Sequence, residues 1–375
     1  MKCYVIAGEA SGDLHGSNLL KALRQADPHA VFRCWGGDLM QAAGGEVVKH
    51  YRDLAFMGFA EVVKNLPTIL GNLKWCKKDI LAWQPDVLVL VDYPGFNLRI
   101  AEWAKAQGFR VVYYIAPQVW AWKPARVKKM KTSIDLMLCI LPFEQAYFAN
   151  QWQWATHYVG HPLVEAIAQF RAATPSVENI PAGCIALLPG SRQQEIALKL
   201  PLMLAAAAQF PHEVFVVAQA PGQEAQFYAP FLSDHPNVRL VNNKTYAILE
   251  RAKAALVTSG TATLETALFG VPEVVCYKGS AISYAIAKRL IKIKYISLVN
   301  LIMDQELVKE LIQDQLSVPK LTQALQDILT PQVSEKIKLG YGLLQDKLQA
   351  GGEASKQAAE KIMAFLSETK AGQGS

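Results

Sequence analysis

Apolar and polar positions alternate along the first half of the chain in a rhythm typical of a parallel sheet with crossover helices. Short apolar runs are separated by longer stretches whose apolar residues fall at helical spacing. Such alternation predicts buried parallel strands joined by helices. The predicted strands are Tyr4–Ala7, Val31–Trp35, Val87–Val91, Val111–Ile115 and Leu136–Leu141, and the predicted helices are Asn18–Gln25 and Leu98–Gln107.

The second half repeats this rhythm and then becomes helical. Its predicted strands are Cys184–Leu188, Val214–Ala218, Val238–Val241, Ala254–Val257 and Glu273–Cys276. Helices are predicted between them at Leu198–Gln209, Thr245–Ala252 and Thr263–Phe269. Further helices are predicted at Leu307–Asp314, Lys320–Ile328 and Val333–Leu348.

The two halves meet in a polar stretch that contains proline. Gly160-His161-Pro162 ends the first half, and Ala172–Pro181 is typical of a linker or loop. We therefore expect an α/β fold with two Rossmann-like, doubly wound parallel-sheet domains, whose strands end at a shared cleft. The expected boundaries are 1–165 and 166–345 for the two domains and 346–375 for a C-terminal helix and tail.

Composition narrows the classes of function. The chain of 375 residues carries 38 Lys and Arg against 32 Asp and Glu, a net charge of +6. This mild excess fits an anionic substrate or membrane surface and is too weak to indicate nucleic acid. Six scattered cysteines without C-x-x-C indicate buried thiols rather than a zinc site. Because we find neither an export signal nor a membrane-spanning apolar run, we expect a cytoplasmic protein.

The first candidate site follows the first predicted strand. Gly8, Gly12 and Gly16 are spaced by four residues at the predicted entry to a helix. Glycines let backbone N–H groups approach a ligand, and a helix N-terminus attracts an anion. The spacing fits neither a dinucleotide fingerprint nor a P-loop. A tight strand-to-helix turn capped by Asp13 is the structural alternative.

A second candidate is Asp92, which directly follows the strongly apolar run Val87–Val91. Ligands of such sheets bind at the carboxyl ends of the strands. A carboxylate there could take a proton from an attacking hydroxyl group. The alternative is a turn-forming Asp ahead of a proline.

Two motifs of the second half could bind a diphosphate. Gly190 and Ser191 can present backbone amides, and Arg192 can fork onto phosphate oxygens. Residues 258–265 open a helix with small hydroxyl residues and a glycine, and Glu265 could accept hydrogen bonds from ribose. The alternatives are an ordinary helix entry and a well-capped helix. No Asp-x-Asp occurs, so these groups rather than a metal ion would neutralise a leaving group.

Aromatic residues precede a run of basic residues in the first half. Trp120 and Trp122 are followed by Arg126, Lys128, Lys129 and Lys131. Aromatic faces beside positive charge suit a headgroup or a sugar. A core Trp pair with a solvated basic helix is the alternative.

An apolar stretch with lysines could lie in a membrane interface. It begins at Phe56-Met57-Gly58-Phe59. The apolar residues that follow at helical spacing are Leu66, Ile69, Leu70 and Leu73, and the lysines just after them are Lys74, Lys77 and Lys78. This pattern fits an interfacial helix, and equally an amphipathic helix that faces the core.

Taken together and in order, six motifs resemble those of the lipid-A-disaccharide synthases, a family of glycosyltransferases with the two-Rossmann GT-B architecture. The resemblance extends from residue 3 to about residue 345. The motifs are Ala7-Gly8-Glu9-Ala10-Ser11-Gly12-Asp13, Val119-Trp120-Ala121-Trp122, Leu141-Pro142-Phe143-Glu144, Leu187-Leu188-Pro189-Gly190-Ser191-Arg192, Ser259-Gly260-Thr261-Ala262 and Ser297-Leu298-Val299-Asn300-Leu301-Ile302.

The resemblance implies a reaction. UDP-2,3-diacylglucosamine would donate its sugar to the 6-hydroxyl of 2,3-diacylglucosamine 1-phosphate, giving UDP and a β-1,6-linked disaccharide phosphate. It also implies an enzyme that needs neither metal nor cofactor and is bound peripherally to the inner membrane of a Gram-negative-type source. C-terminal helices would cross back to the N-domain, and a homodimer with exchanged C-terminal segments is allowed.

The resemblance also assigns roles by position. Asp92 matches the general base, and Gly95 stands where a second acid is expected in some relatives, which leaves Asp92 as the only candidate. The implied donor residues are Gly190, Ser191, Arg192, Ser259, Gly260, Thr261, Glu265 and Asn300. The implied acceptor-side residues are Glu9, Ser11, Gly12, Asp13, Trp120 and Trp122. The implied membrane and acyl-chain residues are Phe56, Met57, Phe59, Leu66, Ile69, Leu70 and Leu73.

Two rival functions remain open at this point. A UDP-sugar 2-epimerase would share the two-domain plan and act without a lipid acceptor. A non-catalytic lipid- or nucleotide-binding protein would bind UDP and form no product. A nicotinamide dehydrogenase is disfavoured because G-x-G-x-x-G is missing.

Overall fold

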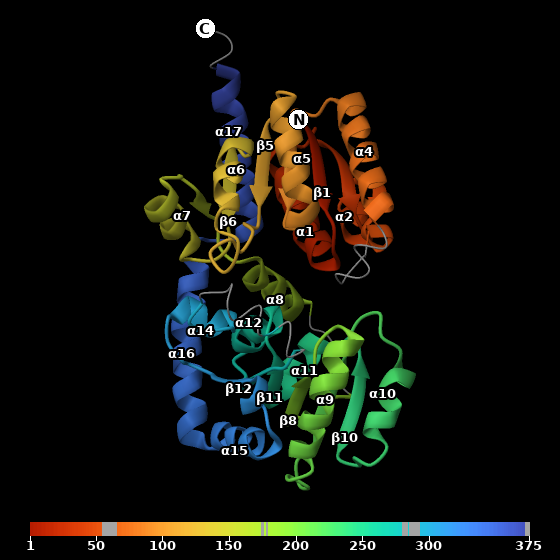
Figure 1. Ribbon diagram of the computed structural model, residues 1–375, viewed down its shortest axis with the longest axis vertical. Helices are drawn as coiled ribbons and strands as arrows, with labels where there is room; N and C mark the ends of the chain where they lie inside the picture. The colour runs from red at the N-terminus through yellow and green to blue at the C-terminus, as the bar shows by residue number, and fades with distance from the viewer. Residues whose placement is uncertain (55–65, 174–175, 178, 280–283, 285–292, 372–375) are drawn as a thin grey trace. The chain divides into compact units, whose positions relative to one another are not determined.

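The computed structural model describes residues 1–54, 66–173, 176–177, 179–279, 284 and 293–371. The chain divides into two compact units. Unit 1 comprises Met1–Pro162 with Leu348–Ser375, and unit 2 comprises Leu163–Lys347. Each unit is built on one parallel sheet flanked by helices (Figure 1), as the alternating pattern predicts.

The sheet of unit 1 has the strand order β3-β2-β1-β4-β5-β6-β7, and its strands pair in parallel. The order reverses between β1 and β4, which makes the carboxyl ends of these two strands the switch point of the sheet. The strands are β1 (Lys2–Ala7), β2 (Val31–Gly36), β3 (Glu46–His50), β4 (Val87–Val91), β5 (Val111–Tyr114), β6 (Leu136–Cys139) and β7 (His157–Tyr158).

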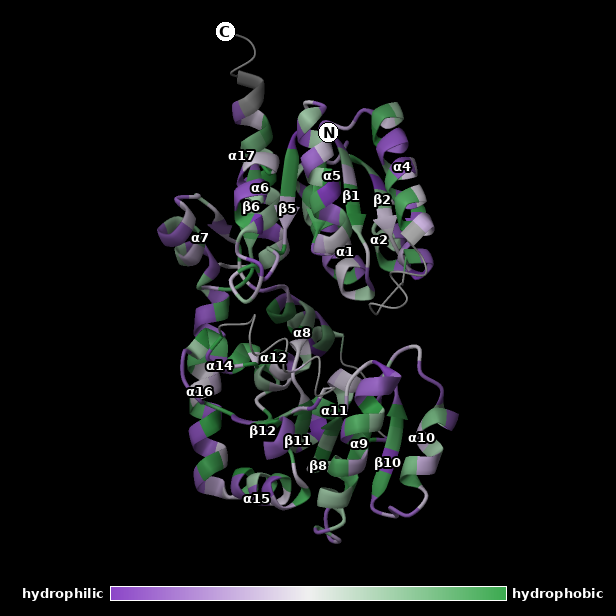
Figure 2. Cartoon of the chain, viewed as in Figure 1, coloured by the Kyte–Doolittle hydropathy of each residue, from purple (hydrophilic) through white to green (hydrophobic). Residues whose placement is uncertain are grey.

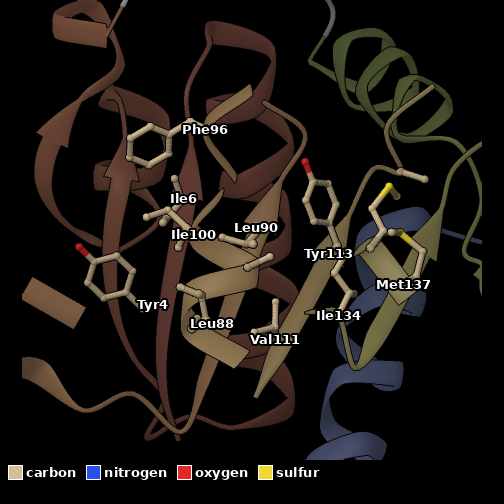
Figure 3. Packing of buried hydrophobic residues seen from close by; sticks show 14 of the residues in the cluster. Tyr4, Ile6, Leu88, Leu90, Phe96, Ile100, Val111, Tyr113, Ile134 and Met137 are labelled. Carbon is tan, nitrogen blue, oxygen red and sulfur yellow. The ribbon is translucent and has the colours of Figure 1, made fainter. Parts of the chain in front are cut away.

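Side chains of this sheet alternate between two apolar layers, as the period of a strand requires. Tyr4, Leu88 and Tyr113 belong to the layer covered by α4, α5 and α6 (Figure 3). Val5 and Val89 belong to the other layer, covered by α1 and α17. The helices of unit 1 are α1 (Ala10–Ala26), α2 (Asp38–Ala42), η1 (Tyr51–Leu54), α4 (Leu66–Trp83), α5 (Pro94–Ala106), α6 (Arg126–Ser133), α7 (Glu144–Trp152) and α17 (Ala354–Ala371).

The sheet of unit 2 repeats the same plan in the order β10-β9-β8-β11-β12-β13, again with parallel neighbours. Its switch point lies between β8 and β11. The strands are β8 (Cys184–Leu188), β9 (Phe215–Gln219), β10 (Val238–Asn242), β11 (Ala252–Thr258), β12 (Glu273–Tyr277) and β13 (Lys309–Ile312). Figure 2 shows the central strand β8 as largely apolar, in line with its complete burial.

Helices of unit 2 cover its sheet, with α15 packed on α9 and on strands β11 and β12, and α12 packed on β11. The helices are α8 (Pro162–Ala172), α9 (Gln193–Ala207), α10 (Ala225–Leu232), α11 (Thr245–Arg251), α12 (Thr261–Leu268), α14 (Leu298–Met303), η2 (Gln313–Gln315), α15 (Val318–Leu329) and α16 (Pro331–Gln349).

The C-terminal segment returns to unit 1, as the family resemblance implies. Helix α17 packs along α1, and its residues Ala358 and Ile362 complete the apolar layer of β1 and β4. The return passes Gly160 so closely that a Cβ on Gly351 would lie 2.2 Å from the Gly160 nitrogen. Only glycine fits such an approach of two backbones.

One predicted element is wrong in type, and the predicted helices of α1, α5 and α9 begin too late. The segment Leu307–Asp314 is strand β13 followed by a short 3-10 turn, not a helix. Its apolar spacing fits a helix, but pairing with β12 at the edge of the sheet overrides that local preference. Helix α1 begins at Ala10, so most of the predicted glycine loop is its first two turns. The elements that were not predicted are strands β3 and β7 and helices α2, α7, α8, α10 and α14.

All six cysteines are free and buried. Among the described helices, none combines the length and the apolar character that crossing a membrane requires.

Candidate functional site

The switch point of unit 1 brings together two predicted acidic residues, Glu9 after strand β1 and Asp92 after strand β4. Ala7 of β1 pairs with Val91 of β4, so the chain leaves the two strands side by side at Gly8 and Asp92. The ring of Tyr93 packs directly on Gly8, where a Cβ would lie 2.3 Å from a ring carbon. Glycine at this position therefore allows the two loops to touch.

The backbone of Asp92 is held in an uncommon conformation. Asp92 and Tyr93 have φ values of 45° and 50°, in the left-handed region that costs most residues energy. The carbonyl oxygen of Asp92 accepts hydrogen bonds from Asn97 Nδ2 at 2.8 Å and from the Tyr113 hydroxyl at 2.6 Å. These bonds to the backbone fix the turn without using the carboxyl group of Asp92, which itself accepts a hydrogen bond from the Tyr93 N–H.

The environment of Asp92 makes its carboxylate a stronger base than usual. Burial disfavours the charged form, and the charge of Glu9 adds to that effect, so the pKa of Asp92 is raised to about 6. Glu9 lies at the N-cap position of α1. A carboxylate with this pKa is mostly ionised at neutral pH and can still accept a proton, which suits a general base.

The other predicted acceptor-side residues of α1 differ in what they contact. Asp13 is buried and accepts hydrogen bonds from the backbone N–H groups of Gly37, Leu39 and Met40 at 2.7, 3.1 and 3.0 Å. It therefore caps the start of α2 rather than its own helix. Gly12 is buried against Ala7, whereas Ser11 is exposed.

Glu144 is a buried carboxyl group whose role was not predicted from the sequence. It accepts hydrogen bonds from Trp120 Nε1 at 3.0 Å and from the Leu141 N–H at 3.0 Å. Burial, opposed in part by these bonds, raises its pKa to about 7. Glu144 thus orients Trp120, whereas Trp122 is exposed. The signal available in the sequence was the motif that ends in Glu144, which we used only for the resemblance.

The switch point of unit 2 is hollowed into a pocket of about 290 Å³. Val257 of β11 pairs with Leu188 of β8, which places the two predicted donor motifs beside each other. Six of the eight predicted donor residues line the pocket: Gly190, Ser191, Ser259, Gly260, Thr261 and Glu265.

The N-terminus of α12 forms one wall of this pocket. Gly260 precedes the helix with a φ of 148°, which glycine adopts without strain. The first amides of a helix lack partners within it and attract anions. Thr258, which opens the predicted motif but was given no role of its own, lines the pocket with a buried hydroxyl that has no hydrogen-bond partner among the described residues.

Glu265 is oriented by one neighbour. Its Oε1 accepts a hydrogen bond from the hydroxyl of Tyr246 at 2.9 Å. Burial raises the pKa of Glu265, and the bond from Tyr246 opposes that shift. The carboxyl group therefore stands at the pocket wall in a fixed orientation with acceptor capacity to spare.

The remaining two predicted donor residues do not line this pocket. Arg192 occupies the N-cap position of α9 without a capping hydrogen bond from its side chain, and its guanidinium lies 2.8 Å from the carboxylate of Glu195. Asn300 is fully buried. Its Nδ2 donates to Val308 and Glu310 at 2.8 and 2.9 Å, and its Oδ1 accepts from the Val308 N–H at 3.0 Å. Asn300 therefore ties α14 to β13.

The predicted membrane stretch lies partly within α4. Leu73 is buried in the core of unit 1, and Ile69 packs against that core. Leu70 and Trp75 are 53% and 43% exposed. Phe56, Met57 and Phe59, as well as the side chain of Leu66, lie outside the described residues.

Solved structures of two kinds resemble this chain. A UDP-GlcNAc 2-epimerase from Neisseria meningitidis, bound to UDP-GlcNAc, aligns with a TM-score of 0.65 over 97% of this chain and 100% of that chain, at 13% identity. The glycotransferase of kitacinnamycin aligns with a TM-score of 0.65 over 97% of this chain and 98% of that chain, at 14% identity. At such identities the likeness establishes the fold. The chain is a two-Rossmann-domain protein of the GT-B class.

Sequence comparison resolves the family within that class. The family model described as lipid-A-disaccharide synthetase matches residues 3–364. The lipid-A-disaccharide synthase of Acidobacterium capsulatum is 37% identical over 96% of this chain and 94% of that protein. That of Geobacter metallireducens is 34% identical over 98% of each. The chain belongs to the lipid-A-disaccharide synthase family and is a glycosyltransferase of lipid A biosynthesis.

Proposed function

We propose that the protein transfers 2,3-diacylglucosamine from its UDP conjugate to the 6-hydroxyl of 2,3-diacylglucosamine 1-phosphate. The products are the β-1,6-linked disaccharide 1-phosphate and UDP. Family membership over nearly the whole chain supports this choice of substrates. The observation that carries the chemistry is Asp92, a half-buried carboxyl group of raised pKa at the switch point of unit 1.

Asp92 acts as the general base in this proposal. The acceptor hydroxyl attacks C1 of the donor from the face opposite the diphosphate, which inverts the configuration at C1. As the new bond to C1 forms and the bond to the diphosphate breaks, the proton of the hydroxyl passes to Asp92. Such assistance contributes roughly 10²–10⁴-fold to a rate. Holding the hydroxyl in line contributes further by orientation.

The pocket of unit 2 binds the donor in this proposal. Backbone N–H groups of Gly190, Ser191, Gly260 and Thr261 hold the diphosphate as UDP departs, because a helix N-terminus stabilises negative charge there. Glu265 accepts hydrogen bonds from the ribose. These groups take the place of a metal ion.

Three further donor-side residues act around that pocket. Arg192 neutralises the departing diphosphate from the start of α9, and the hydroxyl of Ser259 belongs to the same wall. Asn300 acts as a positioning residue, since its amide orders the segment between α14 and β13.

Residues of unit 1 shape the acceptor side in this proposal. Glu9 tunes the basicity of Asp92 through its charge. Ser11 and Trp122 are exposed and can contact the acceptor, whereas Gly12 and Asp13 shape the loop from within.

Peripheral attachment to the inner membrane is part of the proposal. Both substrates carry acyl chains, so the enzyme must reach them at a lipid surface. Leu70 and Trp75 on α4 are exposed apolar side chains, with Lys74 and Lys78 exposed beside them. Apolar side chains flanked by lysines suit an anionic interface.

One incubation tests the proposed reaction. The purified protein is mixed with UDP-2,3-diacylglucosamine and 2,3-diacylglucosamine 1-phosphate in EDTA, and the products are identified by mass spectrometry. We expect the disaccharide phosphate and one UDP for each disaccharide. Epimerised UDP-sugar or free UDP in a control without acceptor would indicate an epimerase or a hydrolase. UDP binding without any product would indicate a binding protein.

A further inference from the structure

A pocket in unit 1, between α5 and α6, has no role in the chemistry described above. Its volume is about 210 Å³. Pro94 and Gly95, which begin α5 immediately after the Asp92 turn, form one side of it. Met130 and Ser133 of α6 belong to the opposite side. The pocket therefore starts within three residues of the proposed base.

Charge distinguishes this pocket from an ordinary groove between helices. Arg99, Arg126 and Lys129 line it together with one acidic residue, Glu102, so three cations and one carboxylate leave a net charge of +2. Lys129 Nζ lies 3.3 Å from Glu102 Oε1. Neither Arg99 nor Arg126 forms an ion pair with a carboxylate in the part of the chain that the structure describes.

Arg126 lies over Trp122, and its positive charge acts on Tyr113, which holds the turn of the proposed base. Its guanidinium lies over the ring of Trp122, 5.5 Å from the centroid. Burial and the charge of Asp92 raise the pKa of Tyr113, and the nearby guanidinium of Arg126 opposes that shift. Because the Tyr113 hydroxyl donates to the Asp92 carbonyl oxygen, the charge of Arg126 lies within electrostatic reach of the Asp92 turn.

We propose that this pocket binds the anomeric phosphate of the acceptor sugar, with Arg99 and Arg126 as its principal ligands. The inference rests on the proposed function and adds a subsite to it. A guanidinium binds two phosphate oxygens at once through its planar fork, which gives orientation as well as affinity. Anchoring the phosphate would hold the single sugar ring by its C1 end while its 6-hydroxyl stands at Asp92.

Substitution of the two arginines tests the assignment. The quantity compared is the preference of the full-length enzyme, defined as kcat/KM for the acceptor with its 1-phosphate divided by kcat/KM for the dephosphorylated acceptor. We expect Arg126→Ala to lower this preference about tenfold or more, because one charge-assisted contact is lost. Arg99 is exposed, so Arg99→Ala should lower the preference without risk to folding.

Lys128→Ala is the matched control, since Lys128 is an exposed cation of the same helix that does not line the pocket. It should leave the preference unchanged. An equal loss on both acceptors in Arg126→Ala would overturn the assignment, because it would mean that Arg126 supports only the Asp92 turn. An unchanged preference with weaker binding to phosphatidylglycerol vesicles would also overturn it, in favour of a phospholipid headgroup.

A soluble probe separates this inference from the reaction itself. Glucosamine 1-phosphate and glucosamine are titrated into the wild-type protein and the variants by calorimetry. We expect binding that requires the phosphate and is weakened about tenfold in Arg126→Ala but not in Lys128→Ala. That result would support the pocket even if no disaccharide formed in the incubation described above. Equal binding of the two sugars would refute the pocket while leaving the transferase reaction intact.

Discussion

Asp13 gives a prediction about stability that separates two roles for one residue. Its carboxylate accepts backbone hydrogen bonds from Gly37 and Met40, both buried, and from Leu39, whose side chain is largely exposed. Water can replace the partner of the Leu39 N–H, but not those of the other two. A hydrogen bond to a charged group contributes about 1.5–3 kcal/mol. We therefore expect Asp13→Ala to lower the free energy of unfolding by about 3–6 kcal/mol.

Two comparison variants sharpen this test. Asp13→Asn keeps an oxygen for two of the three amides and should cost about 1–2 kcal/mol, since the charge and one acceptor are lost. Asp38→Ala removes an exposed partner of Arg52 at the start of α2, the helix that Asp13 caps. It should lower the free energy of unfolding by under about 1 kcal/mol.

The assay is urea unfolding of the full chain together with hydrogen exchange at the Gly37 and Met40 amides. Both amides should lose protection in Asp13→Ala. If unfolding and exchange are unchanged while KM for the acceptor rises, then Asp13 binds substrate and the capping role is refuted.

Three further predictions concern the reaction. Because the pKa of Asp92 is raised to about 6, its basic form is lost as the pH falls through that value. The value of kcat/KM should therefore decline tenfold per pH unit below about pH 6. A flat pH profile of kcat/KM down to pH 5 would contradict this. Glu265→Gln should weaken UDP binding about tenfold, or ~1.4 kcal/mol, by calorimetry; an unchanged Kd would remove Glu265 from the donor site. Leu70→Ser with Trp75→Ser should reduce sedimentation with phosphatidylglycerol vesicles while the helical far-ultraviolet circular dichroism signal is retained, whereas unchanged sedimentation would exclude these two side chains as anchors.

Much of the fold could be predicted from the pattern of apolar positions, because buried parallel strands appear in the sequence as short continuous apolar runs. Val87–Val91 is apolar throughout, and it is a central strand. The strand at Lys309–Ile312 could not be predicted in this way. Its apolar positions fit a helix, and only pairing with β12 makes it a strand. Helix α1 was predicted too short, because Gly12 and Gly16 disfavour a helix locally. In the structure both glycines lie within the helix, where a Cβ on Gly12 would lie 3.1 Å from the Cβ of Ala7 and one on Gly16 would lie 2.7 Å from the sulfur of Met40.

The candidate site was predictable where chemistry follows strand ends, and less so where it depends on contacts distant in sequence. Asp92 follows a strand directly, and the motifs at Gly190 and Gly260 converge because parallel strands end at one edge. Glu144 escaped prediction because its partner, Trp120, lies 24 residues away. Asn300 carries the polar side chain expected of a ligand contact, yet its hydrogen bonds are satisfied within the unit.

The central claim is that Asp92 removes the proton of the acceptor hydroxyl, and single-turnover kinetics of Asp92→Asn test it most directly. The substitution preserves the turn, because Asn97 and Tyr113 bind the backbone oxygen rather than the side chain, and Asn tolerates a left-handed conformation. We predict that the rate of sugar transfer falls by roughly 10²–10⁴-fold while the Kd for UDP is unchanged. Transfer at a near-normal rate in this variant would contradict the account.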